Sequence, residues 1–260
     1  MSLLQGILLG LVQGITEILP ISSDGHLAIL QYIWNIPEAV RVNLTAALHL
    51  GTALAILFAF WHRLKEIITG VFTAEPVKRR ENIKLVIFIF FASLPTVFAG
   101  IFIKDLIEKF FTQKSFIAIF FLLNGTLLYL TRYAKEKRDS LNWVTAILIG
   151  LIQTTALLPA ISRSGTTISL AVLLGVSRKK AFDFSFLLAV PVTIGAALFE
   201  LLQIDFSLLA PGAVFLGIFL AGASGVLMVF LLRRWVTSQR FFLFGVYCWL
   251  MGLLVLFLLR

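Results

Sequence analysis

The feature that most constrains this chain is a pair of long apolar regions, residues 3–34 and 143–175, each interrupted by a short polar stretch. The first interruption is Pro20-Ile-Ser-Ser-Asp-Gly25, and the second is Pro159-Ala-Ile-Ser-Arg-Ser-Gly165. A helix that crosses a bilayer needs about 20 mostly apolar residues. The part that follows the second interruption, residues 166–175, covers only about 15 Å as a helix. Each region therefore predicts a broken helical hairpin rather than a straight crossing.

Six other stretches are long and apolar enough to cross a membrane. Of the 260 residues, 60% are hydrophobic and only 13% are charged, whereas a soluble domain carries about a quarter charged residues. The composition therefore predicts a single integral membrane domain, residues 1–260, of the all-α polytopic class. Its predicted architecture is six transmembrane helices plus two re-entrant helical hairpins whose tips are covered by protein. The predicted spans are residues 44–61, 84–103, 115–132, 182–203, 211–232 and 240–259.

The basic residues predict how the chain is oriented in the membrane. Four loops, residues 62–84, 132–142, 176–181 and 233–240, hold 16 of the 22 Lys and Arg residues. With six crossings these loops fall on one face, which the excess of positive charge identifies as cytoplasmic. Both termini are then expected outside. Because the basic residues lie in short loops rather than in one stripe, the net charge of +9 does not indicate nucleic-acid binding.

The two interrupted regions resemble each other at a separation of 140 residues. The sequence predicts repeat 1 at about residues 1–135 and repeat 2 at about residues 141–260. Three crossings separate the hairpins, so the second copy would be inverted in the membrane, and such folds place their site near the midplane. Chance similarity between two glycine-rich apolar stretches is the alternative. The matched pairs are Gly10 and Gly150, Leu11 and Leu151, Gln13 and Gln153, Ser22 and Ser162, and Gly25 and Gly165.

Ionisable and hydroxyl side chains gather at the first interruption. Glu17 stands among apolar residues, and a carboxylate at membrane depth is a candidate functional group. Structural readings also exist: Glu17 as a pairing residue, one serine as a helix N-cap, and the histidine as a hydrogen-bonded core residue. The predicted site residues around Glu17 are Gln13 one turn before it, Ser22, Ser23 and Asp24 at the start of the second half-helix, and His26 in its first turn.

The second interruption carries the features of an anion site. Arg163 is the one basic residue outside the loops, and its guanidinium matches phosphate oxygens bidentately. The N–H groups that open a helix also attract anions. An ion pair between Arg163 and Glu17 or Asp24 is the structural alternative. The hydroxyl residues predicted to join Arg163 in binding an anion are Ser162, Ser164 and Thr167.

Together the two tips predict a carboxylate, a nucleophile and an anion clamp in one pocket. Such a pocket suits a phosphate ester on a lipid, because attack on phosphorus requires charge neutralisation and a proton acceptor. A divalent cation, Mg²⁺ or Ca²⁺, is the expected cofactor, with Glu17 as its candidate ligand. The sequence contains no His/Cys cluster of the kind that binds zinc and no P-loop.

Two motifs carry a resemblance to a known family. QGITEILPISSDGH and PAISRSGTT resemble the motifs of the undecaprenyl-diphosphate phosphatase family of the bacitracin-resistance type, and the resemblance covers nearly the whole chain. It implies hydrolysis of undecaprenyl diphosphate to undecaprenyl phosphate and inorganic phosphate. That reaction recycles the lipid carrier for cell-wall synthesis and confers bacitracin resistance. The resemblance also implies a place in the bacterial plasma membrane, with the site open to the outer side.

The resemblance assigns a role to each matched position. It implies that Glu17 is a metal ligand or base, Ser23 the nucleophile, His26 the acid or alternative nucleophile, and Arg163 the diphosphate clamp. Water remains a third candidate for the nucleophile. The departures from the family pattern are Gln13 in place of Glu, Asp24 in place of a small hydroxyl residue, and Ala160 in place of Gly, which predicts ordinary backbone angles at residue 160.

A transporter or lipid flippase is the competing function. Inverted repeats with broken helices are typical of secondary transporters, in which Arg163 would bind the carried anion and Glu17 a coupled proton. The sequence leaves open the length of the prenyl chain and the oligomeric state, for which a homodimer is one option.

Overall fold

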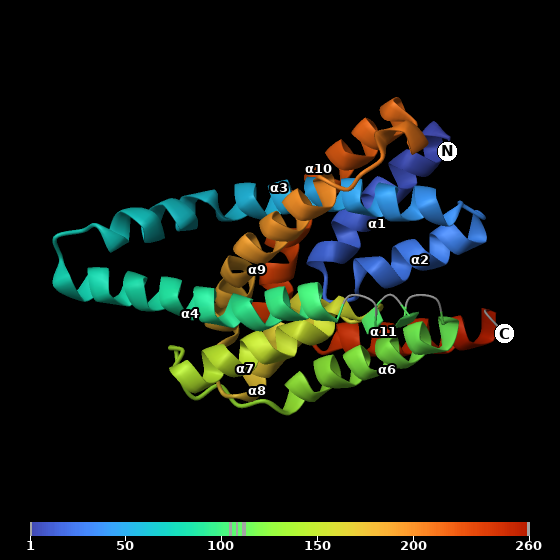
Figure 1. Cartoon of the computed structure of the whole chain (residues 1–260). Helices are drawn as coiled ribbons and strands as arrows, with labels where there is room; N and C mark the ends of the chain where they lie inside the picture. The colour runs from blue at the N-terminus through green and yellow to red at the C-terminus, as the bar shows by residue number, and fades with distance from the viewer. Residues whose placement is uncertain (1, 104–105, 108, 111–112, 259–260) are drawn as a thin grey trace.

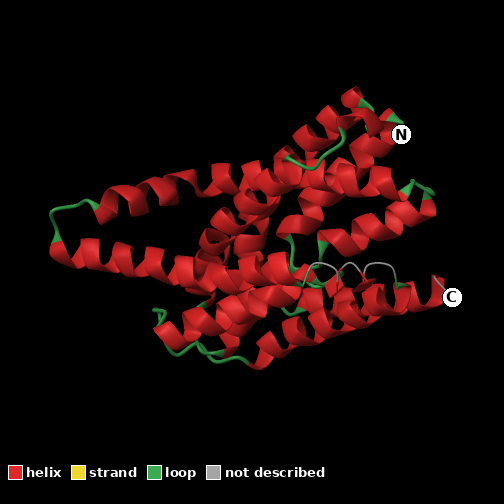
Figure 2. Ribbon diagram, in the orientation of Figure 1, coloured by secondary structure: helices red, strands yellow, loops and turns green. Residues whose placement is uncertain are grey.

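A computed structural model describes residues 2–103, 106–107, 109–110 and 113–258, and this part of the chain is helical without a strand (Figure 2). The long elements match the prediction of an all-α polytopic membrane protein. The α-helices are α1 (Leu3–Ile18), α2 (Ser23–Ile33), α3 (Glu38–Val71), α4 (Pro76–Phe102), α6 (Lys114–Leu130), α7 (Trp143–Gln153), α8 (Arg163–Leu173), α9 (Arg178–Leu201), α10 (Pro211–Thr237) and α11 (Leu243–Leu258). The 3₁₀ turns are η1 (Thr131–Tyr133), η2 (Thr154–Leu157) and η3 (Phe206–Leu208).

Within the described residues, five helices are long and apolar enough to cross a membrane, namely α3, α4, α6 with η1, α9 and α10. The predicted span 240–259 corresponds to α11, which has 16 residues, and residue 259 lies outside the described part. Helix α3 continues past the predicted end at residue 61 to Val71. Its 34 residues cover about 51 Å, more than the ~30 Å of a hydrocarbon core. The hairpin of α3 and α4 accordingly extends beyond the other helices at the left of Figure 1.

The two broken hairpins form where the sequence predicts them. Leu19 and Leu158 both precede a proline, which disfavours helical angles, and both are extended, with ψ of 150° and 144°. Helix α1 therefore ends at Ile18, and η2 ends before residue 158. Figure 1 shows α1 and α2 joined at a turn near the middle of the molecule. The start of α1 and the end of α11 lie at the right of the same view.

Helices of one predicted repeat pack on helices of the other. Helix α1 packs on α10 and α7 packs on α4, while α3 contacts both α9 and α10. Helices α6 and α11 pack together along one side. This arrangement surrounds the two breaks with protein, as irregular backbone in a membrane requires.

The backbone at Ala160 contradicts the expectation of ordinary angles. Its φ is +65°, in the left-handed region, although its side chain is a methyl group. This conformation costs roughly 1–2 kcal/mol for a residue with a Cβ. Ala160 is fully buried, and its Cα lies 3.2 Å from the place where a Cβ on Gly25 would stand. Tight packing of the two tips therefore overrides the local preference that the sequence suggests.

Close contact between α1 and α10 depends on glycines at helical spacing. A Cβ built at Gly10 would lie 2.3 Å from the carbonyl oxygen of Gly217, and one at Gly6 would lie 2.4 Å from that of Ala213. Small residues allow this backbone approach between helices in membranes. The contact fixes α1, and with it the helix that carries Glu17.

We expect Gly10→Ala to destabilise the protein by about 1–3 kcal/mol, because the added methyl group forces α1 away from α10. Thermal unfolding in detergent measures the effect. Gly100→Ala is the matched control: Gly100 also lies in a helix, but a Cβ there meets nothing within 4 Å. Alanine is the better helix former, so the control should unfold at the same or a higher temperature. Equal melting temperatures for the two variants would contradict the packing argument.

Candidate active site

Glu17 and Ser23 meet across the first break. Glu17 lies in the last turn of α1, and Ser23 is the first residue of α2. The Ser23 hydroxyl donates a hydrogen bond of 2.5 Å to Oε2 of Glu17, whose side chain is 15% exposed. A hydroxyl held against a carboxylate is an arrangement in which the carboxylate can accept the hydroxyl proton as the oxygen attacks.

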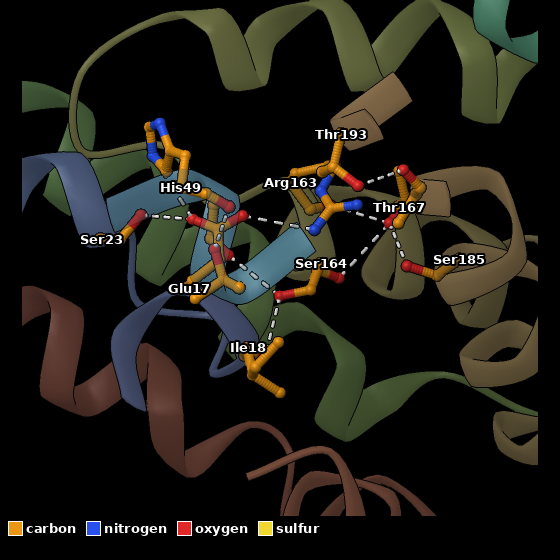
Figure 3. A network of polar contacts seen from close by, with 12 residues as sticks. Glu17, Ile18, Ser23, His49, Arg163, Ser164, Thr167, Ser185 and Thr193 are labelled. Atoms are coloured by element: carbon orange, nitrogen blue, oxygen red, sulfur yellow. Dashed lines mark hydrogen bonds and ion pairs between the residues drawn. The ribbon is translucent and has the colours of Figure 1, made fainter. Parts of the chain in front are cut away.

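Arg163 approaches the same carboxylate from the second break. It is the first residue of α8, and its Nη2 lies 3.4 Å from Oε1 of Glu17. Figure 3 shows Glu17 between Ser23 on one side and Arg163 on the other. The Arg163 side chain is 13% exposed, and its buried Nη1 has no hydrogen-bond partner among the described residues. The guanidinium therefore retains an unused donor although it also forms the ion pair expected as the structural alternative.

The two breaks are joined by direct hydrogen bonds. The Asn124 side chain donates from Nδ2 to the carbonyl oxygen of Pro20 at 3.0 Å and accepts at Oδ1 from the N–H of Ser162 at 3.2 Å. The Ser164 hydroxyl donates to the carbonyl oxygen of Ile18 at 3.2 Å. These bonds satisfy backbone groups that the broken helices leave free. Asn124 was not predicted as a site residue. A single amide side chain within the apolar span 115–132 could have marked it, because polar residues within membrane spans usually have a specific role.

Two predicted hydroxyl residues cap the half-helices. The Ser22 hydroxyl accepts from the N–H of Gly25 at 3.4 Å, and the Ser162 hydroxyl accepts from the N–H of Gly165 at 3.2 Å. Both serines thus act as N-caps, the structural alternative that the sequence left open for such residues. The hydroxyls of Thr167 and Ser185 share a hydrogen bond of 2.6 Å, to the right of Arg163 in Figure 3.

A cavity of about 190 Å³ lies between the breaks, several times the ~30 Å³ share of one water molecule. Six of the predicted site residues line it, whereas Gln13, His26, Ser164 and Thr167 do not. Gln13 is buried with its Nε2 3.5 Å from Oε2 of Glu17, so it supports the site from behind. The predicted residues in the lining are Glu17, Ser22, Ser23, Asp24, Ser162 and Arg163.

The His26 side chain contacts α11 and does not line the cavity. Its Nδ1 lies 2.7 Å from the carbonyl oxygen of Ser22, and its Nε2 lies 2.7 Å from the hydroxyl of Tyr247 on α11. A carbonyl oxygen only accepts, so Nδ1 carries a proton, and a neutral ring would accept at Nε2 from the tyrosine. The structure therefore does not bring His26 to the Glu17–Ser23 pair, and its catalytic role stays a prediction.

Several polar residues of the cavity were missed by the sequence reasoning. His49 and Glu200 are ionisable groups within predicted spans, and that position alone marks a candidate functional residue. The Nε2 of His49 lies 3.5 Å from Oδ1 of Asp24, and its Nδ1 lies 3.5 Å from Oε2 of Glu200. The remaining polar residues in the lining are Thr52, Thr96, Gln153 and Thr193.

The side chains present at the cavity determine whether the expected divalent cation could bind there. The described residues contain no group of three His, Cys, Asp or Glu side chains arranged to hold a metal ion. Magnesium in phosphate-handling sites needs only one or two carboxylates together with substrate oxygens and water. The residues present therefore fit an ion shared between Glu17 and a bound phosphate, and they do not fit an ion caged by protein alone.

Comparison with known proteins identifies relatives along almost the whole chain. Residues 6–254 match the family of the bacitracin resistance protein BacA. The chain is 35% identical to an undecaprenyl-diphosphatase of Thermosipho africanus, over 96% of this chain and 98% of the relative. It is 36% identical to an undecaprenyl-diphosphatase of Methanococcus vannielii, over 98% and 99% of the two chains. A third protein of the same name, from Alkaliphilus metalliredigens, is 35% identical over 98% of both.

We expect Asn124→Ala to lower the free energy of unfolding by about 1–3 kcal/mol, because it leaves the buried Ser162 N–H unpaired and the Pro20 carbonyl with only the weak Cys248 thiol donor. Thermal unfolding in detergent measures the loss. Asn82→Ala is the control, since the half-buried Asn82 amide also donates to a backbone carbonyl, that of Lys78 at 2.8 Å, but in a hydrogen bond that is exposed to solvent. A surface change of this type stays within about 0.5 kcal/mol. An Asn124 variant as stable as the control would disprove the coupling of the two breaks.

Proposed function

The chain belongs to the family of the bacitracin resistance protein BacA, and from this premise we propose that it is a membrane phosphatase of undecaprenyl diphosphate. The reaction yields undecaprenyl phosphate and inorganic phosphate, which recycles the lipid carrier for cell-wall synthesis and gives resistance to bacitracin. The observation that carries the proposal is the contact of Glu17 with both the Ser23 hydroxyl and the Arg163 guanidinium. A nucleophile, a base and an anion clamp thus meet at one cavity.

The Glu17–Ser23 pair supports a two-step hydrolysis. The Ser23 oxygen forms a bond to the terminal phosphorus while its proton passes to Glu17 over the existing hydrogen bond. The bond between that phosphorus and the bridging oxygen breaks, and undecaprenyl phosphate leaves. Water then hydrolyses the phosphoserine and releases inorganic phosphate. Direct attack by water, with Glu17 as the base, is the one-step alternative, and a role for His26 as acid or nucleophile remains part of the proposal.

Arg163 supplies the main attraction for the diphosphate. Its unpartnered Nη1 can donate to a phosphate oxygen while Nη2 keeps its contact with Glu17. The N-termini of α2 and α8 open beside the cavity at Ser22 and Ser162, and free N–H groups at a helix start favour anions. Ser164, Thr167 and Gln13 hold this arrangement from outside the cavity.

A divalent cation, Mg²⁺ or Ca²⁺, completes the proposed site when substrate is bound. Glu17 would hold it together with oxygens of the diphosphate. Bound there, the ion would neutralise charge that develops on the phosphate oxygens.

The same proposal includes the membrane arrangement. Helix α11 serves as a sixth crossing, and the hairpins α1–α2 and α7–α8 are re-entrant from opposite faces as parts of an inverted repeat. Support comes from the reciprocal packing of α1 on α10 and of α7 on α4. The basic loops face the cytoplasm, so both termini and the site opening lie on the outer side of the plasma membrane. A homodimer is compatible with this arrangement.

Transport of a lipid phosphate or another anion is the second candidate function. The meeting of two broken hairpins at one cavity favours it, because secondary transporters bind substrates at such places. Phosphate release from a prenyl diphosphate in detergent requires no sealed compartment, whereas transport requires vesicles. Activity in detergent therefore supports the phosphatase, and movement of lipid in vesicles without phosphate release supports the transporter.

We expect Ser23→Ala to lower phosphate release from prenyl diphosphate in detergent at least about a thousandfold, because the attacking oxygen is lost. Binding of the lipid should persist, since Arg163 is intact. Ser93→Ala is the control, because the Ser93 hydroxyl donates to the Ile89 carbonyl at 2.7 Å on α4 and does not line the cavity. Near-normal release by the Ser23 variant would eliminate the serine route and leave attack by water or His26.

We expect a chelator to lower phosphate release at least about tenfold and added Mg²⁺ or Ca²⁺ to restore it. Equilibrium dialysis without substrate should show only weak cation binding, because the described residues offer no group of three suitable ligands. Full activity in the chelator would rule out the cation. Tight binding without substrate would show instead that the protein itself forms a metal site.

A further inference from the structure

His49 occupies a position between three carboxylates at the cavity. It lies in α3, while Asp24 lies in α2 and Glu200 in α9. Its two ring nitrogens each lie 3.5 Å from one of these carboxylates, and its Nε2 is also 3.9 Å from Oε2 of Glu17. His49, Asp24 and Glu200 all line the cavity. Figure 3 shows His49 beside the Glu17–Ser23 contact.

Three carboxylates at one cavity present a problem for a site that binds a diphosphate. Like charges close together in partly dehydrated surroundings repel each other and repel an anionic ligand. Asp24 and Glu200 also line the same cavity as Arg163. A carboxylate that reached the unpartnered Nη1 of Arg163 would occupy the donor that the substrate needs. In the structure the ion-pair partner of Arg163 is Glu17, and His49 lies against the other two carboxylates.

We propose that His49 is a positioning residue for diphosphate binding, an inference that rests on the proposed phosphatase function. In its protonated form the imidazole attracts Asp24 and Glu200 through these ion-pair contacts and offsets their negative charge, so that these carboxylates neither compete for Arg163 nor repel the bound diphosphate. Glu17 is then the carboxylate left to engage Ser23 and Arg163. The contacts join α2, α3 and α9, so the ring sets the relative positions of groups from both halves of the chain.

The proposal predicts an effect on substrate binding rather than on the chemical step. We expect His49→Ala to raise KM for the prenyl diphosphate at least about tenfold and to change kcat less than about threefold, because the freed carboxylates oppose the diphosphate. His49→Gln should retain a KM near that of the unaltered protein, since its amide has two N–H donors for the same carboxylates. Adding Glu200→Gln to His49→Ala should bring KM back down by removing one opposing charge.

A matched histidine–carboxylate pair on the same helix serves as control. His62 lies 3.2 Å from Glu66, and its side chain is 89% exposed. Both residues lie in α3, but neither lines the cavity. His62→Ala, alone or with Glu66→Gln, should leave KM and kcat unchanged. Isothermal titration with inorganic diphosphate gives a second readout that does not require catalysis. His49→Ala should raise the Kd at least about tenfold there as well.

The outcomes separate this inference from the proposed function. If the unaltered protein releases no phosphate, the phosphatase proposal fails, and the titration with inorganic diphosphate still tests His49. A His49→Ala protein with unchanged KM and Kd but lower kcat and melting temperature would show that the histidine only stabilises packing. A glutamine variant as impaired as the alanine variant, or a double variant with no recovery, would also overturn the proposal.

Discussion

The demand for backbone hydrogen-bond partners within an apolar surrounding determines how the two halves of this protein meet. Two interrupted helices leave carbonyl and N–H groups without helical partners, and lipid offers none. One amide side chain, that of Asn124, pairs with a backbone group at each break: it donates to the Pro20 carbonyl and accepts from the Ser162 N–H. The Ser164 hydroxyl satisfies Ile18 in the same way. Docking of the breaks through these bonds is what brings Glu17 and Arg163 into contact.

The contact between Glu17 and Arg163 is better explained by function than by stability. Both side chains are largely buried, at 15% and 13% exposure, so each charge loses much of its hydration. The attraction within such a pair often only offsets that loss, and apolar residues of similar volume would serve the fold as well. The guanidinium also has a buried donor without a partner, and an unpaired buried donor costs free energy. An anion that binds at this donor removes the cost.

The sequence predicts features that depend on neighbouring residues better than features that depend on residues far apart in the chain. Pro20 and Pro159 act on their immediate neighbours, so both breaks were predicted within a few residues. The direction of His26 depends on the rotation of α2 about its axis, which a short polar stretch does not define. Ala160 shows the limit of local rules, because packing of the tips imposes a left-handed φ on a residue with a Cβ. His49 was missed although it is an ionisable group within a predicted span, and its partner Glu200 is 151 residues away in the sequence.

The matched positions of the two halves show why neither is sufficient for the proposed chemistry. At a separation of 140 residues, Glu17 corresponds to Leu157 and Ser23 corresponds to Arg163. In the proposed reaction one break therefore contributes the base and the nucleophile, and the other contributes the clamp, although both half-helices begin with a matching serine cap. Two identical halves would place either two carboxylates or two cations at the cavity. Because the two halves differ at these positions, the meeting helices give the cavity a negative side and a positive side, which in the proposed reaction activate the nucleophile and bind the diphosphate.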